Sequence, residues 1–128
     1  MADPKIKVGN VEIISISDAV LEFPTSDFFP SVPAEAWEPY GEFLGPDKKL
    51  HPNAGCFVVR SQGRTILVDT GVGDGLDALG GLRGKLMQEL RSNGISPEEV
   101  STVVLTHLHP DHVGWNLTKQ GGQLRPTF

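Results

Sequence analysis

Residues 102–112 read TVVLTHLHPDH and place three of the chain's four histidines directly after an apolar, β-branched run. β-branched residues favour strands, so we predict a buried strand over Thr102–Thr106 that ends at the histidines. His107 and His109 stand two positions apart at this strand end, where alternate side chains share a face. Both imidazoles can therefore reach one metal ion.

Asp111 and His112 follow a turn expected at Pro110 and can reach a second position beside the first, while Gly114 allows close backbone approach nearby. Such an arrangement suits two metals about 3.5–4 Å apart. Imidazole and carboxylate favour zinc, and iron, manganese or cobalt accept the same donors. Zinc lowers the pKa of its bound water to about 7. The cluster therefore indicates a hydrolase in which Asp111 both ligates and orients the nucleophile.

Composition narrows the class of protein. A chain of 128 residues suits one domain. A net charge of −5 without a basic cluster argues against a nucleic-acid partner. No apolar run reaches membrane-spanning length and no secretory signal is evident, so we expect a cytoplasmic protein that does not bind membranes. Cys56 is the single cysteine, which excludes a disulfide framework and a cysteine-based zinc site.

The first half of the chain reads as strands around a long loop. Alternating apolar residues over Lys5–Ser17 predict two strands joined at Gly9-Asn10. Six prolines fall within residues 24–53, and we predict a long loop there. Two strands over Cys56–Arg60 and Thr65–Asp69 follow, joined by a short hairpin connection, and the second is apolar on both faces and so central.

A helix is predicted next, from about Gly80 to Asn93, by leucines at helical spacing and by the Asn93-Gly94 stop. Ser96, Pro97 and Glu99 form the start signal of a short second helix. Strand, helix and strand in this order indicate a layered α/β or α+β fold with its functional loops at strand ends.

Residues 106–112 resemble the His-x-His-x-Asp-His signature of the metallo-β-lactamase fold superfamily. Residues 66–71, ILVDTG, resemble the strand of that superfamily that ends in an Asp-Thr-Gly turn beside its metals. The resemblance implies an α+β fold, the αββα sandwich, and two zinc ions per complete site. It implies that the metal ligands are His107 and His109 for the first ion and Asp111 and His112 for the second, and that Asp69 supports the ligands.

A narrower resemblance rests on the proline-rich segment and on the stretches HPNAGC, residues 51–56, and HVGWN, residues 112–116. These look like the branch that contains homoserine-lactone lactonases and organophosphate hydrolases. The implied substrate is a lactone, another ester or a phosphotriester.

The ligand count is incomplete for this family, whose dinuclear site takes two more histidines and a bridging aspartate downstream. The sixteen residues after His112 contain no histidine, aspartate, glutamate or cysteine. We therefore expect residues 1–128 to be a partial domain, about the first half of the sandwich, truncated and with weak metal binding and little activity alone. Half a sandwich leaves a sheet edge and an apolar face open, which invites pairing with another chain, for example in a homodimer.

Two alternatives compete with this interpretation. The triplet Asp69-Thr70-Gly71 after an apolar strand also resembles the active-site triplet of dimeric aspartic proteases, but that hypothesis leaves the histidines unexplained. The other alternative is a non-catalytic metal-binding or interaction protein that retains half the fold.

Overall fold

The computed structural model describes residues 4–77 and 80–128. Residues 1–3, part of the stretch in which we expected no secretory signal, lie outside this range. The chain forms two compact units, Val20–Asn53 and a larger unit made of Met1–Ala19 with Ala54–Phe128. In the part of the chain that the structure describes, no helix combines the length and the apolar character needed to cross a membrane.

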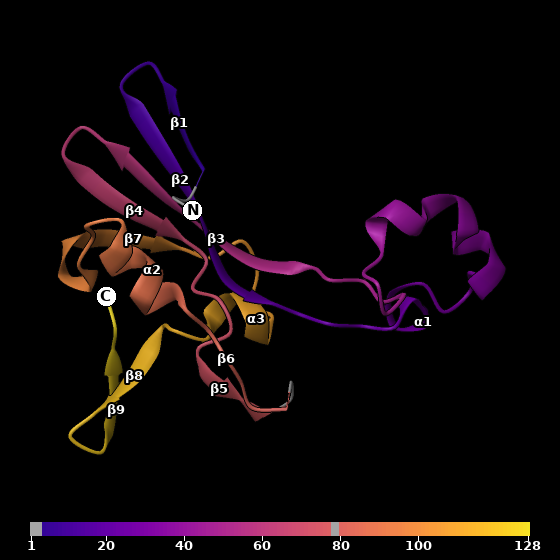
Figure 1. The fold of residues 1–128 in the computed structure, drawn as a ribbon. Coiled ribbons are helices and arrows are strands. Elements are labelled where there is room, and N and C mark those ends of the chain that lie inside the picture. The colour runs from indigo at the N-terminus through magenta and orange to yellow at the C-terminus, as the bar shows by residue number, and fades with distance from the viewer. Residues whose placement is uncertain (1–3, 78–79) are drawn as a thin grey trace. The chain divides into compact units, whose positions relative to one another are not determined.

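A five-stranded sheet is the frame of the larger unit (Figure 1). In spatial order its strands are β1 (Lys5–Val8), β2 (Val11–Val20), β3 (Asn53–Ser61), β4 (Arg64–Val68) and β7 (Val100–Val104). The pairs β1/β2 and β3/β4 are antiparallel, as predicted, and close through residues with positive φ: Gly9 at +59° in the first turn, Gln62 at +49° and Gly63 at +74° in the second.

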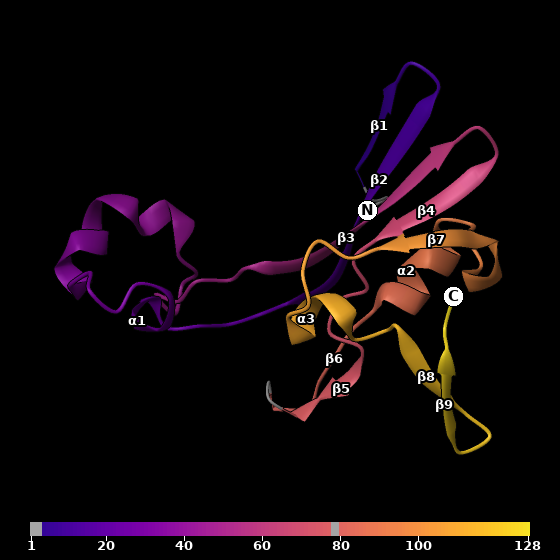
Figure 2. The ribbon, with the colours of Figure 1, turned by 180° about the vertical axis from the view of Figure 1, so that it is seen from behind.

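β4 lies between β3 and β7, so the prediction of a central strand is confirmed. β4 and β7 run parallel, with Val68 opposite Val104, and the backbone N–H of Asp69 donates to the Val104 carbonyl at 2.8 Å. Because both strands end at the same edge of the sheet, the segments that follow them start side by side. This pairing positions the histidine cluster, which follows β7. Figure 2 shows the two strands from behind.

One face of the sheet packs against α2 (Leu86–Ser92) to form the core. Its buried residues are Ile14, Ile16, Cys56, Val58, Leu67, Leu86, Leu90, Ile95 and Val100. Cys56 is a core residue here, since its side chain is fully buried. The short helix predicted after Ser96 is confirmed as η3 (Pro97–Glu99), whose Glu99 carboxylate accepts the Ser96 backbone N–H at 2.6 Å.

The predicted helix from Gly80 to Asn93 was too long at its start. Gly80 and Gly81 have φ of +66° and +77°, which an α-helix does not accommodate. Leu82–Arg83 instead forms strand β6, paired with β5 (Asp74–Leu76). The leucines therefore lie in an α-helix only from Leu86 onward.

The prediction of a buried strand over Thr102–Thr106 was also wrong in part. The strand exists, but it runs over Val100–Val104 at the sheet edge, and Val104 is 45% exposed. Phe57, Val68 and Val104 are paired across β3, β4 and β7 and so share a face, on which Phe57 is 44% exposed. This face of the sheet carries apolar side chains that remain open to solvent.

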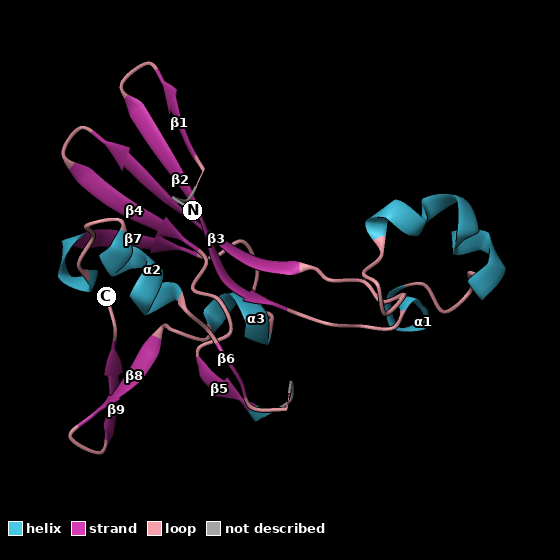
Figure 3. Cartoon of the chain, viewed as in Figure 1, coloured by secondary structure: helices cyan, strands magenta, loops and turns pink. Residues whose placement is uncertain are grey.

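The smaller unit, Val20–Asn53, is not the plain loop that its prolines predicted. It contains α1 (Thr25–Phe28) and the 3₁₀ segment η1 (Ala34–Phe43), drawn as helix in Figure 3. Pro24 and Pro33 directly precede these helical turns in extended conformation, where the missing proline N–H costs no helical hydrogen bond. Reciprocal backbone hydrogen bonds between Phe23 and Leu50, of 3.0 and 2.9 Å, join its two ends.

Beyond β7 the chain forms α3 (Pro110–Val113) and then a hairpin of β8 (Leu117–Gln120) and β9 (Gln123–Pro126). Pro110 occupies the first turn of α3, so the turn predicted there is the beginning of a helix.

Candidate metal centre

The three clustered histidines lie together where β7 ends. His107 and His109 stand in the loop after the strand, and His112 lies in α3. The ring centroid of His107 is 4.5 Å from that of His109 and 4.0 Å from that of His112. The structure thus brings together all three imidazoles that the sequence singled out.

Asp69 joins this cluster from the end of β4, with 5% of its surface exposed. It has a φ of +59°, which is uncommon for a residue other than glycine. Its Oδ1 accepts the Thr106 backbone N–H at 2.8 Å, and its Oδ2 accepts the Thr106 hydroxyl at 2.7 Å and His112 Nδ1–H at 2.8 Å. Burial alone would raise the pKa of Asp69, but these hydrogen bonds lower it below its ordinary value.

The hydrogen bonds also determine which ring nitrogens are free. His112 donates from Nδ1 to the Asp69 carboxylate, so in the neutral ring Nε2 keeps its lone pair. This Nε2 lies 3.4 Å from Oδ2 of Asp111. The Thr106 hydroxyl gives its one proton to Asp69 and therefore accepts from His107 Nδ1–H at 3.1 Å, which frees Nε2 of His107.

Backbone hydrogen bonds tie the segment after Asp69 to the segment around His112. The Thr70 N–H donates to the His112 carbonyl at 2.8 Å, and the Trp115 N–H donates to the Thr70 carbonyl at 3.0 Å. The Gly114 N–H donates to the Gly71 carbonyl at 2.8 Å. A Cβ at Gly114 would overlap the backbone of the neighbouring segment, so the close approach predicted at this glycine is confirmed.

The donors fit zinc by their chemistry, because three imidazoles and a carboxylate are nitrogen and oxygen ligands that zinc accepts. Within residues 4–77 and 80–128, however, no three histidine, cysteine, aspartate or glutamate side chains are arranged to hold one ion.

Sequence reasoning missed Asp18. Its carboxylate is fully buried and accepts N–H groups from the loop after β4, from the start of α2 and from Trp115. A signal was present: in β2 the buried face reads Ile14, Ile16, Asp18, so an acidic residue continues an apolar period of two.

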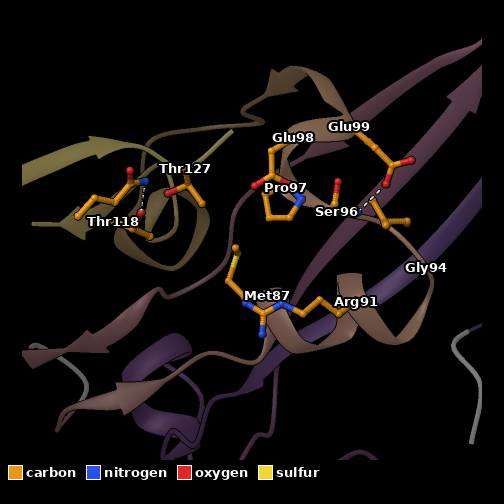
Figure 4. A pocket seen from close by; sticks show the side chains of 11 residues that line it. Met87, Arg91, Gly94, Ser96, Pro97, Glu98, Glu99, Thr118 and Thr127 are labelled. Atoms are coloured by element: carbon orange, nitrogen blue, oxygen red, sulfur yellow. Dashed lines mark hydrogen bonds between the residues drawn. The ribbon is translucent and has the colours of Figure 1, made fainter.

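A pocket of about 580 Å³ lies elsewhere in the larger unit, lined by residues of α2, of the segment before β7 and of the β8–β9 region (Figure 4). Arg91, Glu98 and Thr127 are among the side chains that line it. Because Pro97–Glu99 precede β7 and the histidines follow it, the pocket and the metal centre are at opposite ends of that strand. Its described lining contains no histidine.

Two observations indicate the class of this protein. The fold mixes helices and strands, and the histidine cluster follows a parallel pair of strands. Residues 53–118 match the family model of the metallo-beta-lactamase superfamily. The match spans more than half of the chain, and the chain belongs to this superfamily. The predicted superfamily is therefore confirmed.

The proteins that the chain resembles include lactonases and another hydrolase of the superfamily. The N-acyl homoserine lactonase AiiB of Agrobacterium fabrum is 59% identical over 29 residues, which are 23% of this chain and 10% of AiiB. The dizinc quorum-quenching lactonase AidC superposes with a TM-score of 0.78 at 26% identity, over 92% of this chain and 40% of AidC. The hydrolase AbOPH superposes with a TM-score of 0.71 at 28% identity, over 88% of this chain and 38% of AbOPH.

The chain thus spans about 40% of the length of these two structures. This share agrees with the prediction that it covers only part of the sandwich.

Proposed function

We propose that this chain supplies the first four ligands of a dinuclear zinc hydrolase site. His107 and His109 bind one ion, and Asp111 and His112 bind the other. One observation carries the proposal: the buried Asp69 carboxylate holds the proton of His112 on Nδ1 and so turns Nε2 toward Asp111 as a free ligand. A carboxylate behind a metal-binding histidine fixes its tautomer and raises its basicity.

Zinc, when bound, supplies a Lewis acid that yields hydroxide near neutral pH. The residues of this chain hold the ligand side chains in place and orient the water. Asp69 keeps the His112 ring in one tautomer, and Thr106 fixes Asp69 through its backbone N–H and its hydroxyl. Asp111 would bind metal and orient the attacking water.

We propose a lactone, another ester or a phosphotriester as the substrate. The names of the relatives support these classes, since they include N-acyl homoserine lactonases and the hydrolase AbOPH. We further propose that this chain alone binds metal weakly, because only two ligands per ion come from residues 107–112.

The aspartic protease alternative is disfavoured. Both oxygens of Asp69 accept hydrogen bonds, and one partner is a histidine of the cluster. A non-catalytic protein that binds metal with the same residues remains the second candidate, and only the assay of hydrolysis separates it from the enzyme.

Zinc binding to the 128-residue chain, measured by competition with a chromogenic chelator, tests the site. We expect weak binding that is lost in the double variant His107→Ala, His109→Ala. The matched control is His51→Ala, because His51 belongs to the smaller unit and pairs with Asp47 at 2.9 Å. Zinc affinity that is unchanged in the double variant would overturn the site.

Hydrolysis of a lactone, an aryl ester and a phosphotriester is assayed in parallel, with and without chelator. We expect slow, chelator-sensitive turnover of at least one substrate. Tight binding of two zinc ions with rapid turnover would refute the weak-binding proposal, and zinc binding without any turnover would favour the non-catalytic candidate.

A further inference from the structure

Asp18 is a carboxylate in the core of the larger unit, 0% exposed on the face of β2 that also carries Ile14 and Ile16. A buried charge is unfavourable unless hydrogen bonds satisfy it. Three N–H groups do so. Oδ2 accepts the Val72 backbone N–H at 2.7 Å, and Oδ1 accepts the Leu86 backbone N–H at 2.7 Å and the Trp115 indole N–H at 3.0 Å.

The surroundings of Asp18 leave room for this carboxylate and little else. Gly71 and Gly84 pack directly against it, and a Cβ at either position would overlap the carboxylate atoms. The Lys85 N–H donates to the Asp18 backbone carbonyl at 2.8 Å, which holds the main chain at the same place.

Two of the three donors belong to the segments that carry the metal centre. Val72 lies three residues after Asp69, and Trp115 lies three residues after His112. The Asp18 carboxylate therefore accepts hydrogen bonds from both segments, three residues beyond the Asp69–His112 hydrogen bond. The backbone hydrogen bonds of Thr70 and Gly114 connect the same two segments between these points.

We propose that Asp18 is a positioning residue for the proposed metal site. Through Val72 and Trp115 it sets the separation of the Asp69 and His112 segments, and so keeps Asp69 within hydrogen-bond distance of Nδ1 of His112. The expected effect of Asp18 on zinc binding rests on the proposed function. The Asp69–His112 hydrogen bond that Asp18 supports is present without metal.

Asp18→Asn tests the proposal with nearly unchanged volume. The amide oxygen can accept the N–H groups of Leu86 and Trp115. The NH₂ group then faces the Val72 N–H, and two donors cannot form a hydrogen bond. We expect roughly a tenfold weaker zinc affinity, the lower end of the effect of removing a group behind a metal ligand. We also expect the low-field proton NMR signal of His112 Nδ1–H to be lost or shifted in the zinc-free protein.

Leu90→Ala is the matched control, because Leu90 is a fully buried core residue of α2 that makes none of these hydrogen bonds. It should lower the free energy of unfolding while zinc affinity and the His112 signal stay unchanged. If Asp18→Asn behaves like this control, with lower stability but unchanged affinity and signal, Asp18 is only a structural residue and the proposal is overturned.

Trp115→Phe keeps the proposal testable if Asp18→Asn does not fold. It replaces the indole by a smaller ring without the N–H, and it leaves the Asp18 carboxylate and its Val72 and Leu86 donors in place. It should shift the His112 signal by less than Asp18→Asn, and an unchanged signal contradicts the proposal. If the wild-type chain binds no zinc, the proposed function fails. In that case the His112 signal alone tests the role of Asp18. A changed signal in the variants supports that role, and an unchanged signal overturns it.

Discussion

Nδ1 of His112 lies 2.8 Å from Oδ2 of Asp69, although the two residues are 43 positions apart in the chain. The parallel pairing of β4 and β7 produces this contact, because it starts the two segments side by side at one edge of the sheet. A carboxylate from one strand end thereby orients a histidine that follows the other.

Asp69→Asn should weaken zinc affinity by about 10- to 100-fold, the usual effect of losing the partner behind a metal-bound histidine. The asparagine amide cannot accept all the hydrogen bonds that the carboxylate accepts from Thr106 and His112. Competition with a chromogenic chelator measures the affinity. Asp74→Asn is the control, because Asp74 is an exposed acid paired with Arg83. Equal zinc affinities in the two variants would contradict the role of Asp69.

Gly114→Ala should destabilise the larger unit by about 1–3 kcal/mol, the usual cost of forcing atoms into a packed site. The added Cβ would overlap the backbone of Val72 and Gly73, which cannot move aside as a side chain can. Urea unfolding gives the free-energy difference. Gly41→Ala is the control, because its Cβ would meet no atom within 4 Å. A Gly114→Ala variant as stable as the control would show that this close approach is not required.

The Cys56 thiol should resist alkylation at pH 8 in the folded chain and react once urea unfolds it. Burial, assisted by the charges of Asp18 and Asp69, raises the pKa of Cys56 from 9.0 to about 12. A mass shift after treatment with iodoacetamide reports the modification. Rapid labelling of the folded protein would contradict the observed burial.

The same pKa shift predicts how stability depends on pH. Between pH 9.0 and about 12 the unfolded thiol has lost its proton while the folded thiol keeps it, so folding binds a proton there. The contribution of Cys56 is complete below pH 9.0 and declines as pH rises toward 12. Urea unfolding should therefore show a steeper fall in stability for wild type than for Cys56→Ala across this window. Parallel curves would refute the shift.

The two faces of the sheet should respond differently to truncation. Leu67→Ala on the packed face should cost about 2–5 kcal/mol, whereas Val104→Ala on the open face should cost less than about 1 kcal/mol. Urea denaturation compares the two. A large loss of stability in Val104→Ala would mean that this face is covered in solution, and a concentration-dependent loss would identify a second copy of the chain as the cover.

Local sequence predicted the features whose causes are themselves local. Alternation predicted the β1–β2 hairpin, and two β-rich runs around a short connection predicted the β3–β4 hairpin. Ser96, Pro97 and Glu99 predicted η3, and the density of histidines in residues 107–112 predicted the candidate centre. Each depends on residues a few positions apart, so the pattern is complete within a short window. The superfamily resemblance rested on such windows too, and the family match confirms it.

Local patterns failed where another part of the chain decided the outcome. Leucine spacing predicted a helix from Gly80, but positive φ at Gly80 and Gly81 and the pairing of β6 with β5 delay it to Leu86. An apolar, β-branched strand was expected to be buried, yet burial depends on what packs against it, and β7 is an edge strand with Val104 exposed.

The sequence by itself thus identified the side chains whose chemistry suits metal ligands and the strand end that they follow, because residue chemistry and short-range geometry suffice for both. Only the tertiary structure decided that Asp69 accepts a hydrogen bond from His112, and that Asp18 accepts hydrogen bonds from the segments that follow these two residues. Those contacts join positions 43 to 97 residues apart, and only the packed sheet brings them within hydrogen-bond distance.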